Sequence, residues 1–114
     1  MVLGQEITGK LRGSVNMDRE KRKEKSAAFF ARVRGRVQGV GFRYSAAREA
    51  GRLGLNGYVR NAADGAVEVW AEGPEEKLVL FLKWLSRGPQ FSRVDAVEKE
   101  DRIPKGYGGF NVEY

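Results

Sequence analysis

The residues best suited to chemistry in this chain lie between Gly35 and Arg43, in the order Gly-Arg-Val-Gln-Gly-Val-Gly-Phe-Arg. Glycines let the backbone turn sharply and approach a ligand closely. The sequence that follows has helical spacing, and the start of a helix leaves amide N–H groups unpaired and partially positive. Arg43 adds a planar fork of donors that suits phosphate oxygens. The segment predicts an anion cradle, above all for phosphate. The alternative is a glycine-rich turn with solvated arginines.

This segment does not have the spacing of the known nucleotide-binding loops. It lacks the Lys-Ser/Thr ending of the P-loop, and no acidic residue stands where a dinucleotide fold would hold a ribose. The chain also has no cysteine and no histidine. Disulfides, thiolate chemistry, imidazole metal sites and serine-histidine triads are therefore excluded. No metal-ligand cluster is visible, so we expect neither a metal nor a cofactor.

Length and composition indicate one soluble globular domain. The chain has 114 residues, of which 41% are hydrophobic and 32% charged, which is ordinary for such a domain. No apolar run is long enough to cross a membrane, and the N-terminus has no apolar signal core. We expect a monomeric, cytoplasmic protein without a membrane partner.

The net charge of +6 is unevenly distributed. Residues 1–27 hold seven basic and four acidic residues, which is half of the excess, and the run 18–25 is almost wholly charged. Such a run is usually solvated and mobile. We therefore predict a charged, flexible extension over 1–27 and a folded domain over 28–114. Within that domain, four arginines have no acidic residue among them and would attract a small anion; they are Arg32, Arg34, Arg36 and Arg43.

Hydrophobic periodicity predicts where the strands and helices lie. Strands are expected at 28–36, 55–61, 66–72, 91–100 and 110–114, the last one short. An Asp-Gly turn at Asp64 joins the second and third strands as a hairpin. In the fourth strand, inward positions are expected at Phe91, Val94, Ala96 and Val97.

Two helices are expected between these strands. The first runs from Phe42 or Arg43 to about Leu53, and the second begins at Pro74 and ends near Arg87. The second has a continuous apolar face that belongs to the core, formed by Leu78, Phe81, Leu82 and Leu85. The order strand, helix, strand, strand, helix, strand predicts an α+β, ferredoxin-like split βαβ fold. It has an antiparallel sheet, two helices on one face and a short C-terminal strand.

This topology brings a second segment near the first loop. The first strand lies centrally and pairs with the third, so the end of the second strand and the hairpin turn approach the loop after Arg36. The one neutral amide there is Asn61. Its other interpretation is that of a turn former, since asparagine tolerates unusual backbone angles.

Two motifs together resemble one family. The segment from Gly35 to Arg43 resembles the first signature of the acylphosphatases. The segment Gly57 to Val67, in the order Gly-Tyr-Val-Arg-Asn-Ala-Ala-Asp-Gly-Ala-Val and followed by Gly73, resembles the second. Both stand in the family's order and at a similar separation, and the resemblance covers about 28–114.

The resemblance implies hydrolysis of the mixed anhydride of acyl phosphates to a carboxylate and inorganic phosphate. It implies that Arg43 binds the substrate and that Asn61 positions the attacking water. It also implies that backbone amides of the loop hold the phosphate, over Val37, Gln38, Gly39, Val40, Gly41 and Phe42.

Two other functions remain open from the sequence. Ferredoxin-like sheets can bind RNA through exposed strand aromatics. Phe30, Tyr58 and Trp70 are candidates, aided by Arg34, although no segment matches the RNA-recognition consensus. The other possibility is a module that binds carbamoyl phosphate or a similar anion without hydrolysing it, within a larger maturation system.

Overall fold

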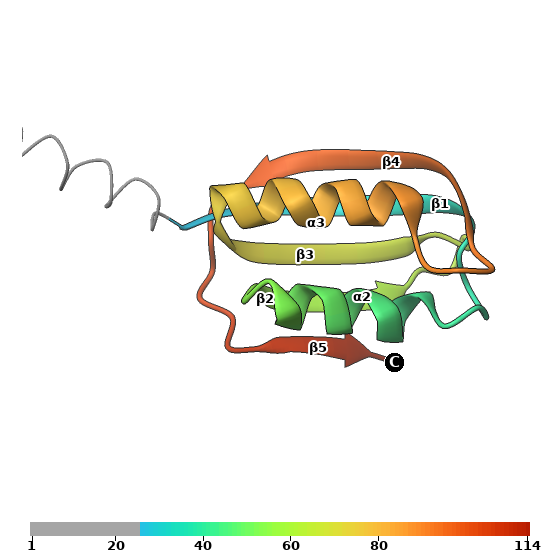
Figure 1. Cartoon of the computed structure of the whole chain (residues 1–114), viewed down its shortest axis with the longest axis horizontal. Coiled ribbons are helices and arrows are strands. Elements are labelled where there is room, and N and C mark those ends of the chain that lie inside the picture. The colour runs from blue at the N-terminus through green and yellow to red at the C-terminus, as the bar shows by residue number, and fades with distance from the viewer. Residues whose placement is uncertain (1–25) are drawn as a thin grey trace, which may run out of the picture.

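The structure is a computed structural model that describes residues 26–114. It contains a five-stranded sheet in the order β4-β1-β3-β2-β5, with two helices packed on one face (Figure 1). The pairs β4–β1, β1–β3 and β3–β2 are antiparallel, whereas β2 and β5 are parallel. The elements, in chain order, are β1 (Ser26–Arg36), α2 (Phe42–Arg52), β2 (Asn56–Asn61), β3 (Val67–Pro74), α3 (Glu75–Arg87), β4 (Arg93–Arg102) and β5 (Phe110–Glu113). The predicted ferredoxin-like α+β fold is confirmed.

The main core lies between the sheet and the helices. From α2 it receives Ala46 and Ala50, both fully buried, with Leu53 at the end of the helix. From α3 it receives the predicted apolar face, in which Phe81 and Leu85 are fully buried. Alternate residues of the central strands fill the other side, because successive side chains of a strand point to opposite faces; they include Ala31, Val33, Val59, Val67, Val69 and Ala71.

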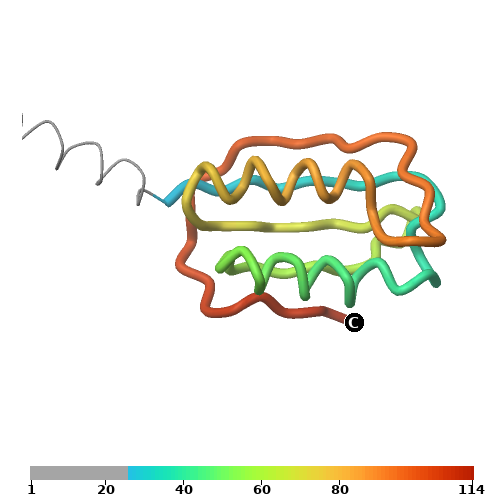
Figure 2. The backbone as a smooth tube through the Cα atoms, viewed as in Figure 1, coloured from blue at the N-terminus to red at the C-terminus, as the bar shows by residue number. Residues whose placement is uncertain are grey.

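The helix-free face of the sheet carries a smaller aromatic cluster. Tyr58 and Trp70 pack beside Ala28 there, and Tyr107 from the β4–β5 connection covers them. The ring centroids of Tyr107 and Tyr58 are 5.7 Å apart, and those of Tyr107 and Trp70 are 6.1 Å apart. The chain path in Figure 2 shows this connection running from the end of β4 to the start of β5, at the end of the sheet where β1 begins.

The prediction for the fourth strand was partly wrong. Phe91 was expected inside, but it is 78% exposed with a positive φ of 74°, in a turn closed by a bond from the Ser92 amide to the Pro89 carbonyl. The strand therefore starts at Arg93. Ala96 is also exposed, while the flanking Val94 and Val97 pack against the core.

A bulge explains this change of inward positions. Arg34 pairs with Ala96, but the next residue, Gly35, pairs with Val94, so β4 has one extra residue at this point. The extra residue moves Val94 onto the same face as Val97. Gly35 is needed there, because an added Cβ would come within 2.1 Å of the Arg93 carbonyl oxygen.

The first strand begins slightly earlier than the predicted start at residue 28. Strand β1 begins at Ser26, and residues 26 and 27 pair with Pro74 and Gly73 of β3. The rest of the predicted extension, residues 1–25, lies outside the described residues.

Candidate active site

The predicted anion loop connects β1 to α2 and is fixed by its apolar side chains. Val37 and Phe42 are each 1% exposed, so their side chains belong to the core. Between them, Gly39 and Gly41 have φ values of 77° and 79°, in the left-handed region that favours glycine. At either glycine an added Cβ would meet no atom within 4 Å, so a side chain there would strain the backbone without a clash.

Within residues 26–114, no side chain accepts a hydrogen bond from the start of α2. Gly41 is the N-cap residue and makes no side-chain cap, and the first turn holds no acidic residue. By contrast, the first turn of α3 holds Glu75 and Glu76. Because the first amides of a helix lack intrahelical partners and carry partial positive charge, the start of α2 is an electrostatically unbalanced donor site.

Arg43 stands in the first turn of α2, and the end of β5 holds it. Its Nη1 donates to the backbone carbonyl of Glu113 at 3.0 Å. Its guanidinium carbon lies 4.8 Å from the ring centroid of Tyr114, within the range of a cation–π contact. The bond to Glu113 uses only one of the several N–H donors of a guanidinium.

Asn61 ends β2 and leads into the hairpin turn. The turn is closed by a bond of 2.8 Å from the Ala62 amide to the Ala66 carbonyl. The Asp64 carboxylate accepts from the Ala66 amide at 3.1 Å, which is the Asx arrangement typical of turns. The Asn61 side chain is exposed.

Arg43 and Asn61 line the same pocket. Its volume is about 140 Å³, and its wall includes the two loop glycines, Gly39 and Gly41. The other lining residues are Val37, Phe42, Tyr44, Val112 and Tyr114. The guanidinium, the carboxamide and the glycine loop thus converge, although they come from two separate sequence motifs. None of the lining residues is acidic.

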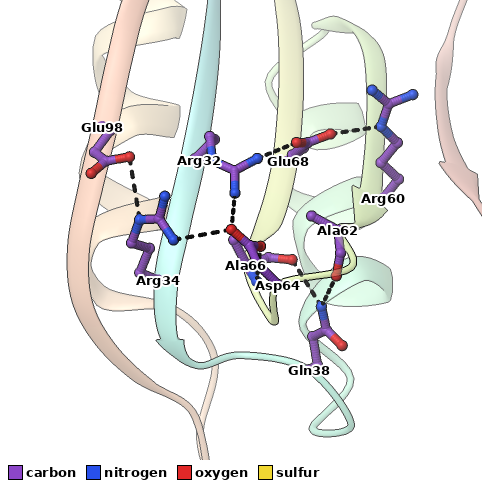
Figure 3. A network of polar contacts seen from close by, with 9 residues as sticks. All are labelled: Arg32, Arg34, Gln38, Arg60, Ala62, Asp64, Ala66, Glu68 and Glu98. Atoms are coloured by element: carbon purple, nitrogen blue, oxygen red, sulfur yellow. Dashed lines mark hydrogen bonds and ion pairs between the residues drawn. The ribbon is translucent and has the colours of Figure 1, made fainter.

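Two predicted loop residues take other positions. Gln38 and Val40 do not line the pocket. Val40 packs against the core, and the Gln38 side chain turns toward the hairpin (Figure 3). The sequence did not predict Tyr44, Val112 or Tyr114 in the wall. The last two arrive through the parallel pairing of β5 with β2, and nothing in the local sequence indicates that pairing.

The arginines of β1 were expected to give an unbalanced positive field, and for two of them this was wrong. Arg32 forms ion pairs with Asp64 and Glu68 on the helix-free face (Figure 3). Arg34 forms two further ion pairs, with its Nη1 3.3 Å from Oδ2 of Asp64 and its Nε 3.3 Å from Oε1 of Glu98. The acidic partners come from other strands and turns that are distant in sequence, so the sequence around these arginines did not predict the ion pairs. Their negative charges offset those of Arg32 and Arg34.

These contacts also affect protonation. The bond from the Ala66 amide, with the charge of Arg32, holds the pKa of Asp64 below its ordinary value. The hydrogen bond to Asp64 and the charge of Glu98 raise the pKa of Arg34. Both groups therefore stay charged near neutral pH, and neither lines the pocket.

Two of the three candidate rings for stacking on bases are buried on the helix-free face. Tyr58 and Trp70 are 9% and 4% exposed beneath Tyr107, and Phe30 is half-buried beside them. Arg34 is engaged with two carboxylates. RNA binding of the ferredoxin-like kind needs accessible rings on the strands, so this arrangement argues against that alternative.

A larger depression of about 500 Å³ lies between α2 and α3, away from the glycine loop. Its wall includes Glu49 and Arg52, which form an ion pair with an O···N distance of 2.5 Å. Trp84 and Pro89 supply its apolar part. Arg48 also lines the depression, with its guanidinium carbon 5.9 Å from the ring centroid of Tyr44. None of the predicted loop residues 37–42 contributes to this wall.

Residues 26–114 contain no group of three or more acidic side chains arranged to hold a metal ion. In the same range, no helix is both long and apolar enough to cross a membrane.

Comparison with known proteins gives consistent matches to one family. The family model described as Acylphosphatase matches residues 29–112. The acylphosphatase of Thermus thermophilus is 54% identical over 82 residues, which cover 72% of this chain and 93% of that protein. The crystal structure of the acylphosphatase from Bacillus subtilis is 40% identical with a TM-score of 0.75, covering 77% of this chain and 99% of that one.

A larger protein contains a similar unit. The crystal structure of HypF from T. kodakarensis is 38% identical with a TM-score of 0.67, and the match covers 77% of this chain. It covers only 12% of the HypF chain, whereas the matches to the acylphosphatases span almost their whole length.

Proposed function

This chain belongs to the acylphosphatase family and hydrolyses acyl phosphates, and from this premise we propose that Arg43, Asn61 and the backbone of the 37–42 loop carry out the reaction. The observation that carries the proposal is the shared pocket, lined by Arg43, Asn61, Gly39 and Gly41. Transfer of a phosphoryl group depends mainly on alignment and charge stabilisation. The groups around this pocket supply both.

Arg43 and the loop amides bind the phosphate of the substrate. The guanidinium offers paired N–H donors to the phosphate oxygens, and the amides at the start of α2 add fixed donors with partial positive charge. Because the bond from Arg43 to the Glu113 carbonyl fixes the guanidinium before substrate arrives, little reorganisation is needed as charge develops on the phosphate. Residues 37–42 bind the phosphate through their main-chain amides and not through their side chains.

Asn61 positions the attacking water. Its carboxamide holds the water behind the phosphorus, in line with the carboxylate leaving group. The water oxygen bonds to phosphorus as the bond from phosphorus to the acyl oxygen breaks, and the electron pair leaves with the carboxylate. Alignment of this kind converts an encounter into a reactive geometry.

The substrate phosphate accepts the proton of the water. The chain has no histidine, and no acidic residue lines the pocket. No side chain around the pocket therefore offers a general base, and in this scheme the substrate takes that role. A carboxylate is already a good leaving group. We expect a turnover rate that is flat near neutral pH and falls where the substrate phosphate becomes protonated.

The test is a continuous assay of acyl-phosphate hydrolysis between about pH 5 and pH 9, the range in which histidine and perturbed carboxyl groups titrate. The Arg43 and Asn61 variants are measured beside the parent. A sharp optimum near neutral pH, unrelated to the substrate's own ionisation, would show that an enzyme group acts as the base. Restoration of activity by magnesium after chelation would contradict the metal-free scheme.

We also propose that the enzyme works as a cytoplasmic monomer. The chain has no cysteine and needs no disulfide, which suits a reducing compartment. The edge strand β4 is rich in charged side chains, which discourages pairing with a second sheet edge. Size-exclusion chromatography with light scattering tests whether the enzyme is a monomer, and cell fractionation tests whether it is cytoplasmic.

A further inference from the structure

Gln38 connects the two halves of the candidate site without lining the pocket. Its side-chain Nε2 donates to the carbonyl oxygens of Ala62 at 2.8 Å and Ala66 at 2.9 Å (Figure 3). These two residues bracket the hairpin turn, and Ala62 directly follows Asn61. One carboxamide therefore bridges the loop that precedes Arg43 and the turn that follows Asn61.

The bridge has no substitute among the described residues. No other hydrogen bond in the range 26–114 joins loop 37–41 to turn 62–66, through either side chain or backbone. The Gln38 bonds are partly buried, so water competes less with them than at an open surface. Since the loop and turn are far apart in sequence, this contact is the main polar restraint on their separation.

The opposite side of the turn is restrained differently. Asp64 is held by Arg32, by Arg34 and by the Ala66 amide. These contacts fix the turn to β1 on the helix-free face of the sheet, and none of them reaches the loop (Figure 3). Among residues 26–114, only Gln38 forms hydrogen bonds between this turn and the loop that precedes Arg43.

We propose that Gln38 is a positioning residue that sets the place of Asn61, and hence of the attacking water, relative to the phosphate held by the loop. This inference rests on the proposed function, because it assumes that Asn61 orients the water. A displacement of about 1 Å in a reacting group can cost about a hundredfold in rate. The two hydrogen bonds limit such a displacement, while phosphate affinity depends on the loop itself.

The proposal predicts a specific kinetic pattern for Gln38→Met, which keeps the length of the side chain and removes its donors. Turnover falls by about tenfold or more, while inhibition by inorganic phosphate changes little. Gln90→Met is the matched control, since Gln90 is exposed in the turn before β4 and makes no side-chain hydrogen bond within the described residues. The control variant should match the parent in both measurements.

The decisive comparison places Gln38→Met in an Asn61→Ala background. If Gln38 acts through Asn61, most of its effect disappears once Asn61 is gone, because residues that act as a unit are not additive. An equal loss of turnover in both backgrounds would overturn the proposal. So would a loss of phosphate inhibition as large as the loss of turnover.

The parent, the Gln38→Met and Asn61→Ala single variants and the double variant together separate this inference from the proposed function. Impaired Asn61→Ala with parent-like Gln38→Met rejects the positioning role alone. Parent-like Asn61→Ala rejects the role of Asn61 and the inference with it. Circular dichroism verifies that each variant is folded at the assay temperature. If Gln38→Met is not, Gln38→Asn takes its place with the same expected pattern, because its shorter carboxamide cannot reach both carbonyls.

Discussion

Two loops at opposite ends of the sheet differ in what accepts the hydrogen bonds of their backbone amides (Figure 1). In the β4–β5 loop, the amides of Lys105, Gly106 and Tyr107 donate to the Glu72 carboxylate at 2.6, 3.0 and 3.2 Å. In the β1–α2 loop, no side chain of the described range accepts a bond from the amides of 37–43. The amides of the β4–β5 loop bind a carboxylate of β3, whereas no carboxylate of the described residues binds the amides of the β1–α2 loop.

The β4–β5 loop shows how such donors lower the pKa of a carboxylate. Glu72 is 4% exposed, and it also accepts from the Trp70 indole at 2.8 Å. Burial alone would raise its pKa, but the amides and the indole outweigh burial and lower the pKa below the ordinary value. Backbone amides, together with one indole N–H, can therefore keep a buried carboxylate charged in this fold. We infer that the β1–α2 loop uses donors of the same kind, its backbone amides, together with Arg43 to bind the phosphate of the substrate.

The comparison also separates stability from activity. Satisfied amides hold the β4–β5 loop in place, whereas unsatisfied donors at a helix start leave stabilisation to be supplied by a ligand. Departures from full local satisfaction are expected where a protein does its chemistry. Variants at the two loops should accordingly change different properties.

The largest expected effect is a loss of turnover on substitution of Arg43, which follows the β1–α2 loop. Arg43→Gln should lower turnover by at least about 10²–10³-fold, the usual loss for one pre-organised donor at a reacting charge. Inhibition by inorganic phosphate should weaken with it. Arg36→Gln is the matched control, because it removes the same charge at the start of the loop from a residue that does not line the pocket. Equal losses in the two variants would indicate general electrostatic attraction and contradict a specific role for Arg43.

Asn61→Ala should lower turnover by about 10²-fold, since it removes the group that aligns water. Phosphate inhibition should stay close to that of the parent, because the loop and Arg43 are intact. Steady-state kinetics with phosphate as a competitor measures both quantities. Asn111→Ala on β5, outside the pocket wall, serves as the control. Parent-like hydrolysis by Asn61→Ala would remove this residue from the mechanism.

At the β4–β5 loop, Glu72→Gln should lower the free energy of unfolding by about 1.5–3 kcal/mol, the range for a hydrogen bond to a charged group. A carboxamide presents an NH₂ group to donors that need an acceptor. Turnover of the folded variant should match the parent, because Glu72 lies at the other end of the sheet from the pocket. Urea unfolding and the hydrolysis assay test the two halves of this prediction.

Acid should remove the Glu72 contribution gradually. Its pKa is lower in the folded protein than in the unfolded chain, so its stabilisation is complete above the ordinary carboxyl pKa of about 4.3. It is lost as the pH falls through the lower folded value. The parent should lose more stability than Glu72→Gln across this window. Parallel pH profiles for the two proteins would show that Glu72 does not bind its donors as a carboxylate.

The sequence was sufficient to predict the elements of the fold and the two motifs of the site. Alternation of apolar residues indicated β1 and β3, and the apolar face of α3 is as predicted. Topology alone brought Asn61 toward the first loop. The glycines of the loop indicated its backbone, since only glycine adopts the positive φ of residues 39 and 41 without strain.

What the sequence did not indicate depends on contacts between distant segments. Glu72 occupies a polar position of an alternating strand, and only the docking of the β4–β5 loop buries it. Tyr114 reaches Arg43 because β5 pairs with β2 in parallel. Phe91 was assigned to the core by its apolar side chain, but a turn and a bulge reverse that assignment. No local pattern encodes these pairings.

The most direct measurement is a titration of ¹⁵N-labelled protein with inorganic phosphate, followed by the backbone amide resonances in NMR spectra. The account predicts saturable shifts of the amides in residues 38–43, while those of Lys105, Gly106 and Tyr107 stay unchanged. Shifts of the second group without the first, or no saturable shift in the 38–43 loop, would contradict the assignment of that loop as the phosphate site.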